Sequence, residues 1–243
     1  GFAVRAQREG QDAPRELGVV ERARRRDLER AERRHDDRHR DVDALKRGNA
    51  LDASQTGAGK TYIALAACAE LGLTPFVIAP LAVLPAWKRA AEFMGVALGD
   101  VTNYDKARMG SASFIAKNKP ANRHKHERTF AFNPRQTNGL FGIVAEDFKP
   151  VLIYDECQKV KNAESLQGQM MADTALQGCK ILALSATAAK DPTEMYGIGL
   201  ALGLHEGGES FKTWAMKFGC RKSGFGVKFT DNPRAAADIL GRL

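Results

Sequence analysis

Residues 52–61 constrain the fold more than any other stretch of the chain. They read Asp-Ala-Ser-Gln-Thr-Gly-Ala-Gly-Lys-Thr, and Ala-rich residues 61–71 follow them directly. Gly57, Ala58 and Gly59 have little or no side chain to keep backbone N–H groups away from an anion. The segment after the loop favours a helix, whose N-terminal dipole would face the same anion. We therefore predict a phosphate-binding loop that opens a helix.

The last two positions of this loop have predicted roles of their own. Lys60 is placed to reach the β- and γ-phosphates of a nucleotide, and the Thr61 hydroxyl is placed to bind magnesium. A glycine-rich turn that happens to precede a lysine would share the spacing, so other motifs must decide. The predicted cofactors are ATP and Mg²⁺, and the predicted nucleotide-binding residues are Ser54, Gln55, Thr56, Gly57, Ala58, Gly59, Lys60 and Thr61.

Two further apolar segments end in polar residues. Residues 150–154 are followed by Asp155 and Glu156, and residues 180–184 lead to Ser185 and Thr187. In a parallel α/β sheet the ligand site lies beyond the carboxyl ends of the strands, where these groups would meet the loop. Asp155 is predicted to hold magnesium and Glu156 to take a proton from the attacking water. The two hydroxyl residues are predicted to bond the carboxylate strand or a phosphate and to relay its state.

The pattern between these motifs alternates strands and helices. Residues 74–79 form an apolar run bounded by prolines, residues 81–93 favour a helix, and residues 101–104 predict a short strand. In the helix, Trp87 and Phe93 are expected as core anchors. This alternation predicts an α/β domain over residues 48–205, with a mostly parallel central sheet and helices on both faces.

Charge favours a polyanionic partner for the chain. Lys and Arg number 37 against 29 Asp and Glu, a net charge of +8, which favours nucleic acid. Residues 1–47 predict a charged helical segment whose arginine clusters either bind phosphates or form a solvated face with internal ion pairs. Residues 108–140 predict a basic insertion, which with Phe130 and Phe132 is either a single-strand contact surface or a solvated loop. Residues 206–243 predict a C-terminal packing extension.

Several classes of site are disfavoured. The four cysteines, at positions 68, 157, 179 and 220, lack C-x-x-C spacing, which argues against a zinc site and gives no disulfide framework. His35 and His39 share a helix face without a third ligand nearby, so a metal site is not expected there. No apolar run approaches the roughly 20 residues that span a bilayer. We expect an intracellular protein with no membrane partner.

Taken together, the motifs resemble the first motor domain of a superfamily 2 helicase or translocase. The closest resemblance is to the Swi/Snf-type DNA-dependent ATPases and their bacteriophage relatives, over roughly residues 48–204. Residues 54–61 match motif I, residues 77–88 match motif Ia, residues 155–158 match motif II and residues 185–187 match motif III. Residues 159–162 resemble the Lys-Asn tail that follows motif II in the Swi/Snf group.

The resemblance implies a RecA-like P-loop NTPase fold and a set of roles. Lys60, Glu156 and Gln158 would be catalytic, with Asp155 and Thr61 on magnesium. Gln158 stands where many relatives carry His, a position that couples the γ-phosphate to the polymer, so coupling is expected to differ here. Contacts with the nucleic-acid backbone are implied for Pro80, Trp87, Lys88 and Tyr104.

The implied activity is ATP hydrolysis that drives movement on nucleic acid. DNA is favoured over RNA by Trp87-Lys88 and Lys161-Asn162, and the implied location is the cytoplasm of a bacterium or phage-infected cell, or the nucleoid. The second motor domain, which supplies arginine fingers in the family, has no counterpart after Leu204 and is expected in cis on a longer chain or in trans. Turnover by this chain alone is expected to be weak or absent. An ATP-binding nucleic-acid scaffold or regulatory module, and an RNA helicase, remain as alternatives.

Overall fold

The computed structural model describes residues 36–118, 128–134, 148–224 and 226–229. The arginine clusters at residues 24–26 and 33–34, and the histidines at positions 35, 124 and 126, lie outside these ranges. Among the described residues, no helix is long and apolar enough to cross a membrane.

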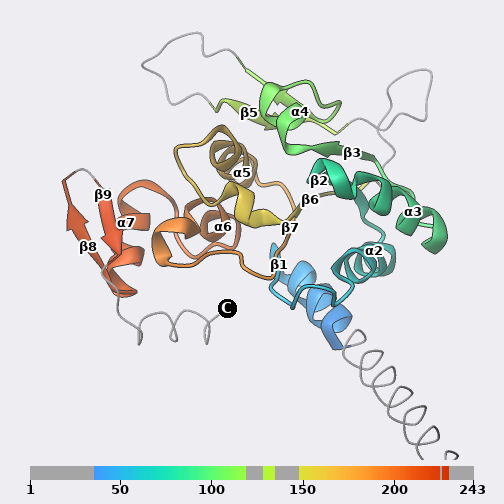
Figure 1. The fold of residues 1–243 in the computed structure, drawn as a ribbon, viewed down its shortest axis with the longest axis horizontal. Coiled ribbons are helices and arrows are strands. Elements are labelled where there is room, and N and C mark those ends of the chain that lie inside the picture. The colour runs from blue at the N-terminus through green and yellow to red at the C-terminus, as the bar shows by residue number, and fades with distance from the viewer. Residues whose placement is uncertain (1–35, 119–127, 135–147, 225, 230–243) are drawn as a thin grey trace, which may run out of the picture.

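The core of the molecule is a five-stranded sheet in the order β1-β7-β6-β2-β3 (Figure 1). All four neighbouring strand pairs are parallel. Parallel neighbours need crossover connections, which here carry the helices. The strands are β1 (Ala50–Asp52), β2 (Thr74–Ala79), β3 (Asp100–Asn103), β6 (Pro150–Asp155) and β7 (Ile181–Leu184).

Both faces of this sheet are buried, which explains why its central strands are apolar throughout. In β2, Phe76 and Ile78 belong to one core cluster while Val77 and Ala79 belong to the other. The first face is covered by α4 (Tyr104–Met109), α5 (Leu166–Leu176) and α6 (Tyr196–Ala201), and the second by helical residues 36–47, α2 (Lys60–Leu71) and α3 (Leu84–Met94). The predicted α/β class, with a parallel sheet and helices on both faces, is confirmed.

The helix ends follow local sequence signals. Gly72, with φ 62°, ends α2 and lets the chain turn directly into β2. A short 3-10 helix, η1 (Leu81–Val83), leads into α3, which carries Pro85 in its first turn as predicted. Asn103 caps α4 by accepting a hydrogen bond from the Lys106 N–H at 2.9 Å.

Helical residues 36–47 are joined to the domain core. Val42 and Leu45 are buried against the α2 side of the sheet. The Lys180 ammonium donates to the Leu45 and Gly48 carbonyls at 2.5 and 3.2 Å, so a cation closes the carboxyl end of this helix. This part of the charged N-terminal segment therefore packs with the α/β domain.

The predicted basic insertion contains an antiparallel hairpin of β4 (Ile115–Lys117) and β5 (Phe130–Phe132). Phe130 and Phe132 are buried, and the Phe132 ring packs edge-on against Phe76 of the main sheet. The interpretation of these two rings as a single-strand contact surface is wrong. The two residues are two positions apart in one strand, so both side chains point to the same face, into the core.

Side chains of α5 and of the residue that follows it form hydrogen bonds with the outer edge of β5. The Asp173 carboxylate accepts from the Phe130 N–H at 2.9 Å. The Gln177 amide accepts from the Phe132 N–H and donates to the Phe132 carbonyl, both at 2.8 Å. Two residues one helical turn apart thus supply the hydrogen bonds that a further strand would supply.

The chain after β7 forms a helical segment and a small aromatic layer. The 3-10 helix η3 (Pro192–Met195) leads into α6, and α7 (Gly208–Lys217) is followed by the antiparallel strands β8 (Cys220–Ser223) and β9 (Gly226–Phe229). Phe211 and Trp214 of α7 lie beside His205. Phe211 is buried and Trp214 packs against it in a small cluster with Tyr196.

Candidate active site

The polar residues identified in the sequence lie at one edge of the sheet. In the strand register Asp52 of β1 is opposite Leu184 of β7, and Leu184 is opposite Asp155 of β6. Three segments therefore begin at the same edge of the sheet: the phosphate-loop candidate, the Ser185 segment and the carboxylate pair. Ser185 extends this alignment, because its N–H donates to the Asp52 carbonyl at 3.0 Å.

The loop between β1 and α2 is shaped by glycine and lysine. Gly57 and Gly59 have φ angles of 81° and 89°, a region that other residues rarely adopt. The Lys60 ammonium donates to the Ser54 and Gln55 carbonyls at 2.6 and 2.8 Å. The lysine thereby holds the loop closed from within and places its positive charge inside the loop.

This loop fits an anionic phosphate group on three observations. No side chain caps α2, and its first turn carries no acidic residue, so its leading N–H groups suit an anion. A side chain built at Gly57 would meet nothing within 4 Å, which shows that the backbone there is open to approach. The Ser54 hydroxyl oxygen is buried without a hydrogen-bond partner among the described residues.

Asp155 is held by two aromatic residues of other elements. The Trp87 indole N–H donates to Asp155 Oδ2 at 2.8 Å, and the Tyr104 hydroxyl donates to the Asp155 carbonyl at 2.8 Å. Burial raises the pKa of the Asp155 carboxyl, and the Trp87 hydrogen bond and the Lys60 charge act in the opposite direction. The carboxylate is thus partly enclosed but has a fixed donor and a nearby cation.

Glu156 and Gln158 connect the carboxylate strand to the segment after β7. The Gln158 amide donates to Glu156 Oε2 at 2.6 Å and accepts from the Ser185 hydroxyl at 2.6 Å. Ser185 Oγ in turn accepts from the Thr187 N–H at 3.0 Å. Of the predicted pair, the Ser185 side chain joins this chain of bonds and Thr187 joins through its backbone.

Glu156 has an unusual backbone conformation. Among the described residues other than glycine, only Glu156 has a positive φ, at 54°. Such conformations cost on the order of 1–3 kcal/mol and cluster at functional sites. The turn it makes leads directly into η2 (Cys157–Val160), which brings Gln158 back toward the Glu156 side chain.

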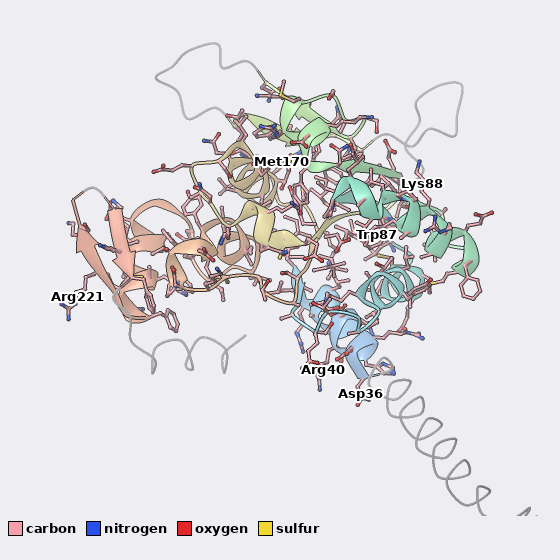
Figure 2. The ribbon with its side chains drawn as sticks, viewed as in Figure 1. Asp36, Arg40, Trp87, Lys88, Met170 and Arg221 are labelled. Atoms are coloured by element: carbon pink, nitrogen blue, oxygen red, sulfur yellow. The ribbon has the colours of Figure 1, made fainter. Side chains whose placement is uncertain are left out.

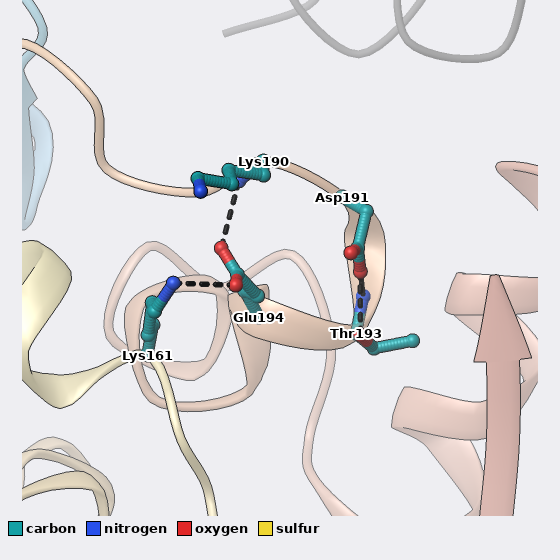
Figure 3. A network of polar contacts seen from close by, with 5 residues as sticks. All are labelled: Lys161, Lys190, Asp191, Thr193 and Glu194. Carbon is teal, nitrogen blue, oxygen red and sulfur yellow. Dashed lines mark hydrogen bonds and ion pairs between the residues drawn. The ribbon is translucent and has the colours of Figure 1, made fainter. Parts of the chain in front are cut away.

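A polar network links the segments that follow β6 and β7 (Figure 3). Lys161 pairs with Glu194 Oε1 at 2.6 Å, and Glu194 Oε2 accepts from the Lys190 N–H at 2.8 Å. Asp191 accepts from the Thr193 N–H at 2.8 Å and so caps η3. The lysine of the Lys-Asn tail therefore fixes the position of η3.

The four predicted nucleic-acid contacts divide into two groups. Lys88 is exposed and Pro80 is half-buried, so both are available at the surface. Trp87 is 0% exposed and Tyr104 is buried, so their prediction as direct polymer contacts is wrong. Figure 2 labels Trp87 and its exposed neighbour Lys88 on α3. The two aromatic residues face Asp155 instead, a role that the sequence analysis missed.

Phe93, expected in the core, is 84% exposed. Trp87, Ala90 and Ala91 form the buried stripe of α3 at spacings of three and four residues. Phe93 lies to one side of that stripe, so its ring points to solvent.

The donor set at the sheet edge fits magnesium better than a transition metal. Among the described residues, no three His, Cys, Asp or Glu residues are grouped to hold a metal ion. Mg²⁺ usually keeps several waters and takes one or two protein oxygens together with phosphate oxygens. A threonine hydroxyl and a carboxylate, as Thr61 and Asp155 provide, match that preference.

Comparisons with known proteins find similarity to a protein named as a helicase and to a solved ATPase core. No protein-family model matches the chain. A mimivirus protein from Acanthamoeba polyphaga mimivirus, named as a candidate ATP-dependent RNA helicase, is 29% identical over 152 residues, which are 60% of this chain and 27% of that protein. The solved SWI2/SNF2 ATPase core of Sulfolobus solfataricus in complex with dsDNA is 18% identical, with a TM-score of 0.44, covering 80% of this chain and 38% of that one. The chain is similar to a superfamily 2 helicase-like motor domain and spans well under half the length of either relative.

Proposed function

We propose that the chain is the ATP-binding half of a nucleic-acid motor that hydrolyses ATP. One observation carries this proposal: the phosphate-loop candidate and the carboxylate pair leave the sheet at the same edge, through the register of Asp52, Leu184 and Asp155. The Lys60 charge acts on the Asp155 carboxyl across this edge. A cation-bearing anion cradle beside two carboxylates is the arrangement that phosphoryl transfer requires.

In this proposal the loop binds the nucleotide. The backbone N–H groups around Gly57 and Gly59 and the start of α2 would cradle the phosphates, with Lys60 turning from the loop carbonyls toward them. Thr61 and Asp155 would hold magnesium. When bound, magnesium neutralises charge on the β- and γ-phosphate oxygens.

The carboxylate segment would carry out the proton transfer. Glu156 takes a proton from the water that attacks the γ-phosphate. Because Oε2 of Glu156 already accepts from Gln158, the side chain is oriented in advance. Gln158 also accepts from Ser185, so the state of Glu156 would be transmitted to the segment after β7.

For the polymer, we propose DNA first and RNA as the second candidate. The exposed Lys88 on α3 and the net charge of +8 favour contact with phosphate groups of either polymer. DNA is supported by the Swi/Snf-like Trp87-Lys88 and Lys161-Asn162 pairs. RNA is supported by the name of the viral relative. A motor of this kind would work in the cytoplasm or at the nucleoid, where its polymer lies.

ATP turnover at low salt tests the proposal. The assay compares no polymer, single-stranded DNA, duplex DNA and RNA, beside a titration with a fluorescent ATP analogue. We expect weak turnover that duplex DNA stimulates, and an affinity for DNA that falls steeply as the salt concentration rises. Glu156→Gln should abolish turnover and leave nucleotide binding in place.

Each outcome separates one part of the proposal. Unchanged turnover in Glu156→Gln would remove Glu156 as the base. Stimulation by RNA alone would replace DNA by the second candidate. Nucleotide binding without turnover under every condition would refute hydrolysis by this chain alone and favour a scaffold, or a missing arginine finger, whose absence costs about 10³ to 10⁵ in rate in related enzymes. Absence of nucleotide binding would refute the proposal.

A further inference from the structure

The contact between Trp87 and Asp155 joins two elements that are distant in sequence. Trp87 lies on α3, after β2, and Asp155 ends β6. The indole N–H donates to Asp155 Oδ2 at 2.8 Å, and the Trp87 side chain is 0% exposed. A buried Trp needs an acceptor for its single N–H. Here that acceptor is the carboxylate proposed to hold magnesium.

The geometry of the donor makes this bond directional. An indole has one N–H in the plane of a rigid ring, and this ring is locked in the core beside Ala90 and Ala91. The bond to Oδ2 therefore fixes the rotation of the carboxylate about its own axis. The Tyr104 hydroxyl, which donates to the Asp155 carbonyl at 2.8 Å, fixes the backbone of the same residue.

We infer that Trp87 is a positioning residue for magnesium, acting through Asp155. The inference rests on the proposed function, in which Asp155 holds the magnesium of the nucleotide complex. Groups that hydrogen-bond a metal ligand orient it, and their removal typically costs about 10- to 100-fold in metal affinity or activity. Trp87 thus faces the proposed magnesium ligand, while its neighbour Lys88 is exposed on the outside of the same helix.

The first experiment replaces Trp87 by Phe, which keeps an aromatic ring and removes the N–H donor. Binding of a fluorescent ATP analogue is measured as Mg²⁺ is titrated, and again in EDTA. We expect Trp87→Phe to raise the half-saturating Mg²⁺ concentration about 10-fold or more, and to change binding in EDTA by less than about twofold. An unchanged Mg²⁺ requirement would overturn the inference, as would an equal loss in EDTA.

Two other variants separate this inference from the proposed function. Trp214→Phe changes the other tryptophan of the chain, which lies in the aromatic layer of α7, and should leave the Mg²⁺ requirement unchanged. Asp155→Asn should raise the requirement at least as much as Trp87→Phe. If Asp155→Asn raises the Mg²⁺ requirement and Trp87→Phe does not, the inference about Trp87 is refuted while the proposed function stands. If wild-type binding shows no Mg²⁺ dependence, the proposed function fails.

A spectroscopic measurement covers the case in which Trp87→Phe does not fold. In Trp214→Phe, Trp87 is the sole tryptophan, and its indole N–H touches the proposed metal ligand. Adding Mg²⁺ to the nucleotide-bound protein should change the intensity of its emission, and EDTA should reverse the change. The same addition to Asp155→Asn in that background should have no effect. Emission that ignores Mg²⁺ while nucleotide binding depends on it would overturn the inference.

Discussion

Asp41 should make the stability of the protein depend on pH. This residue lies in helical residues 36–47 and is 6% exposed, and its Oδ2 atom has no hydrogen-bond partner among the described residues. Burial raises the pKa of the Asp41 carboxyl from 3.8 to about 7, and the charges of Asp52 and Asp37 act in the same direction. Its ionisation is therefore opposed in the folded state.

The sign and size of the effect follow from this pKa. Because the folded pKa is raised, the folded state holds the proton more tightly than the unfolded state. The contribution to stability is fully present below pH 3.8 and is lost as the pH rises through about 7. The whole shift corresponds to about 4 kcal/mol, of which about 3 kcal/mol is lost between about pH 5 and pH 8.

Urea denaturation of wild type and Asp41→Asn between pH 5 and pH 8 measures this contribution. The free energy of unfolding of Asp41→Asn, relative to wild type, should rise by about 3 kcal/mol over that range, because the amide does not ionise. Asp43→Asn, an exposed position on the same helix, is the matched control and should give a flat difference. A flat difference for Asp41→Asn as well would refute the argument from burial.

Two other substitutions test contacts of α5 and the residue that follows it. Gly168→Ala should lower the free energy of unfolding by about 2–3 kcal/mol in urea denaturation, because a Cβ at Gly168 would lie 2.0 Å from the Asn162 carbonyl oxygen. Gly48→Ala, where a Cβ would meet nothing within 4 Å, is the control. Equal losses of stability for the two variants would contradict the prediction. Gln177→Leu should lower stability by about 1–2 kcal/mol and speed hydrogen exchange at β5, because both Phe132 backbone groups lose their partner. Unchanged exchange of the Phe132 amide would show that its bond to Gln177 does not hold the strand in place.

Local patterns were sufficient to predict the main sheet and the alignment of the candidate site residues at one of its edges. Apolar runs that lead to Asp155 and Ser185 predicted strands whose ends meet the phosphate loop, and the strand register aligns Asp155 with Leu184 and Asp52. The Gly-rich loop before an Ala-rich segment predicted the start of α2. These features depend on residues close together in the chain, where backbone preference and hydropathy decide the outcome.

Contacts between distant residues were not predictable in the same way. Trp87 and Asp155 are 68 positions apart, and only the order of strands brings them together. Lys161 and Glu194 are 33 positions apart, in two segments that no periodicity connects. For Trp87, helix spacing predicted a core anchor whereas the family motif implied a polymer contact, and the structure supports the first.

The spacing of Phe130 and Phe132 in the sequence already indicated that both are buried. Phe130 and Phe132 are separated by one residue, a period of two that favours one buried face of a strand. The basic composition of the surrounding residues suggested solvent exposure instead. Composition describes the average environment of a segment, while the alternation describes the individual side chains.

The bonds from Asp173 and Gln177 to β5 also bear on how this region can evolve. At the open end of the hairpin, the Asn118 N–H donates to the Thr129 carbonyl at 2.8 Å, so its two strands are joined where the connecting residues leave. The outer strand is already satisfied by a helix, which removes an edge that could pair with other chains. Replacing Asp173 or Gln177 during evolution would therefore expose the edge of β5 to pairing with other chains, which constrains both positions.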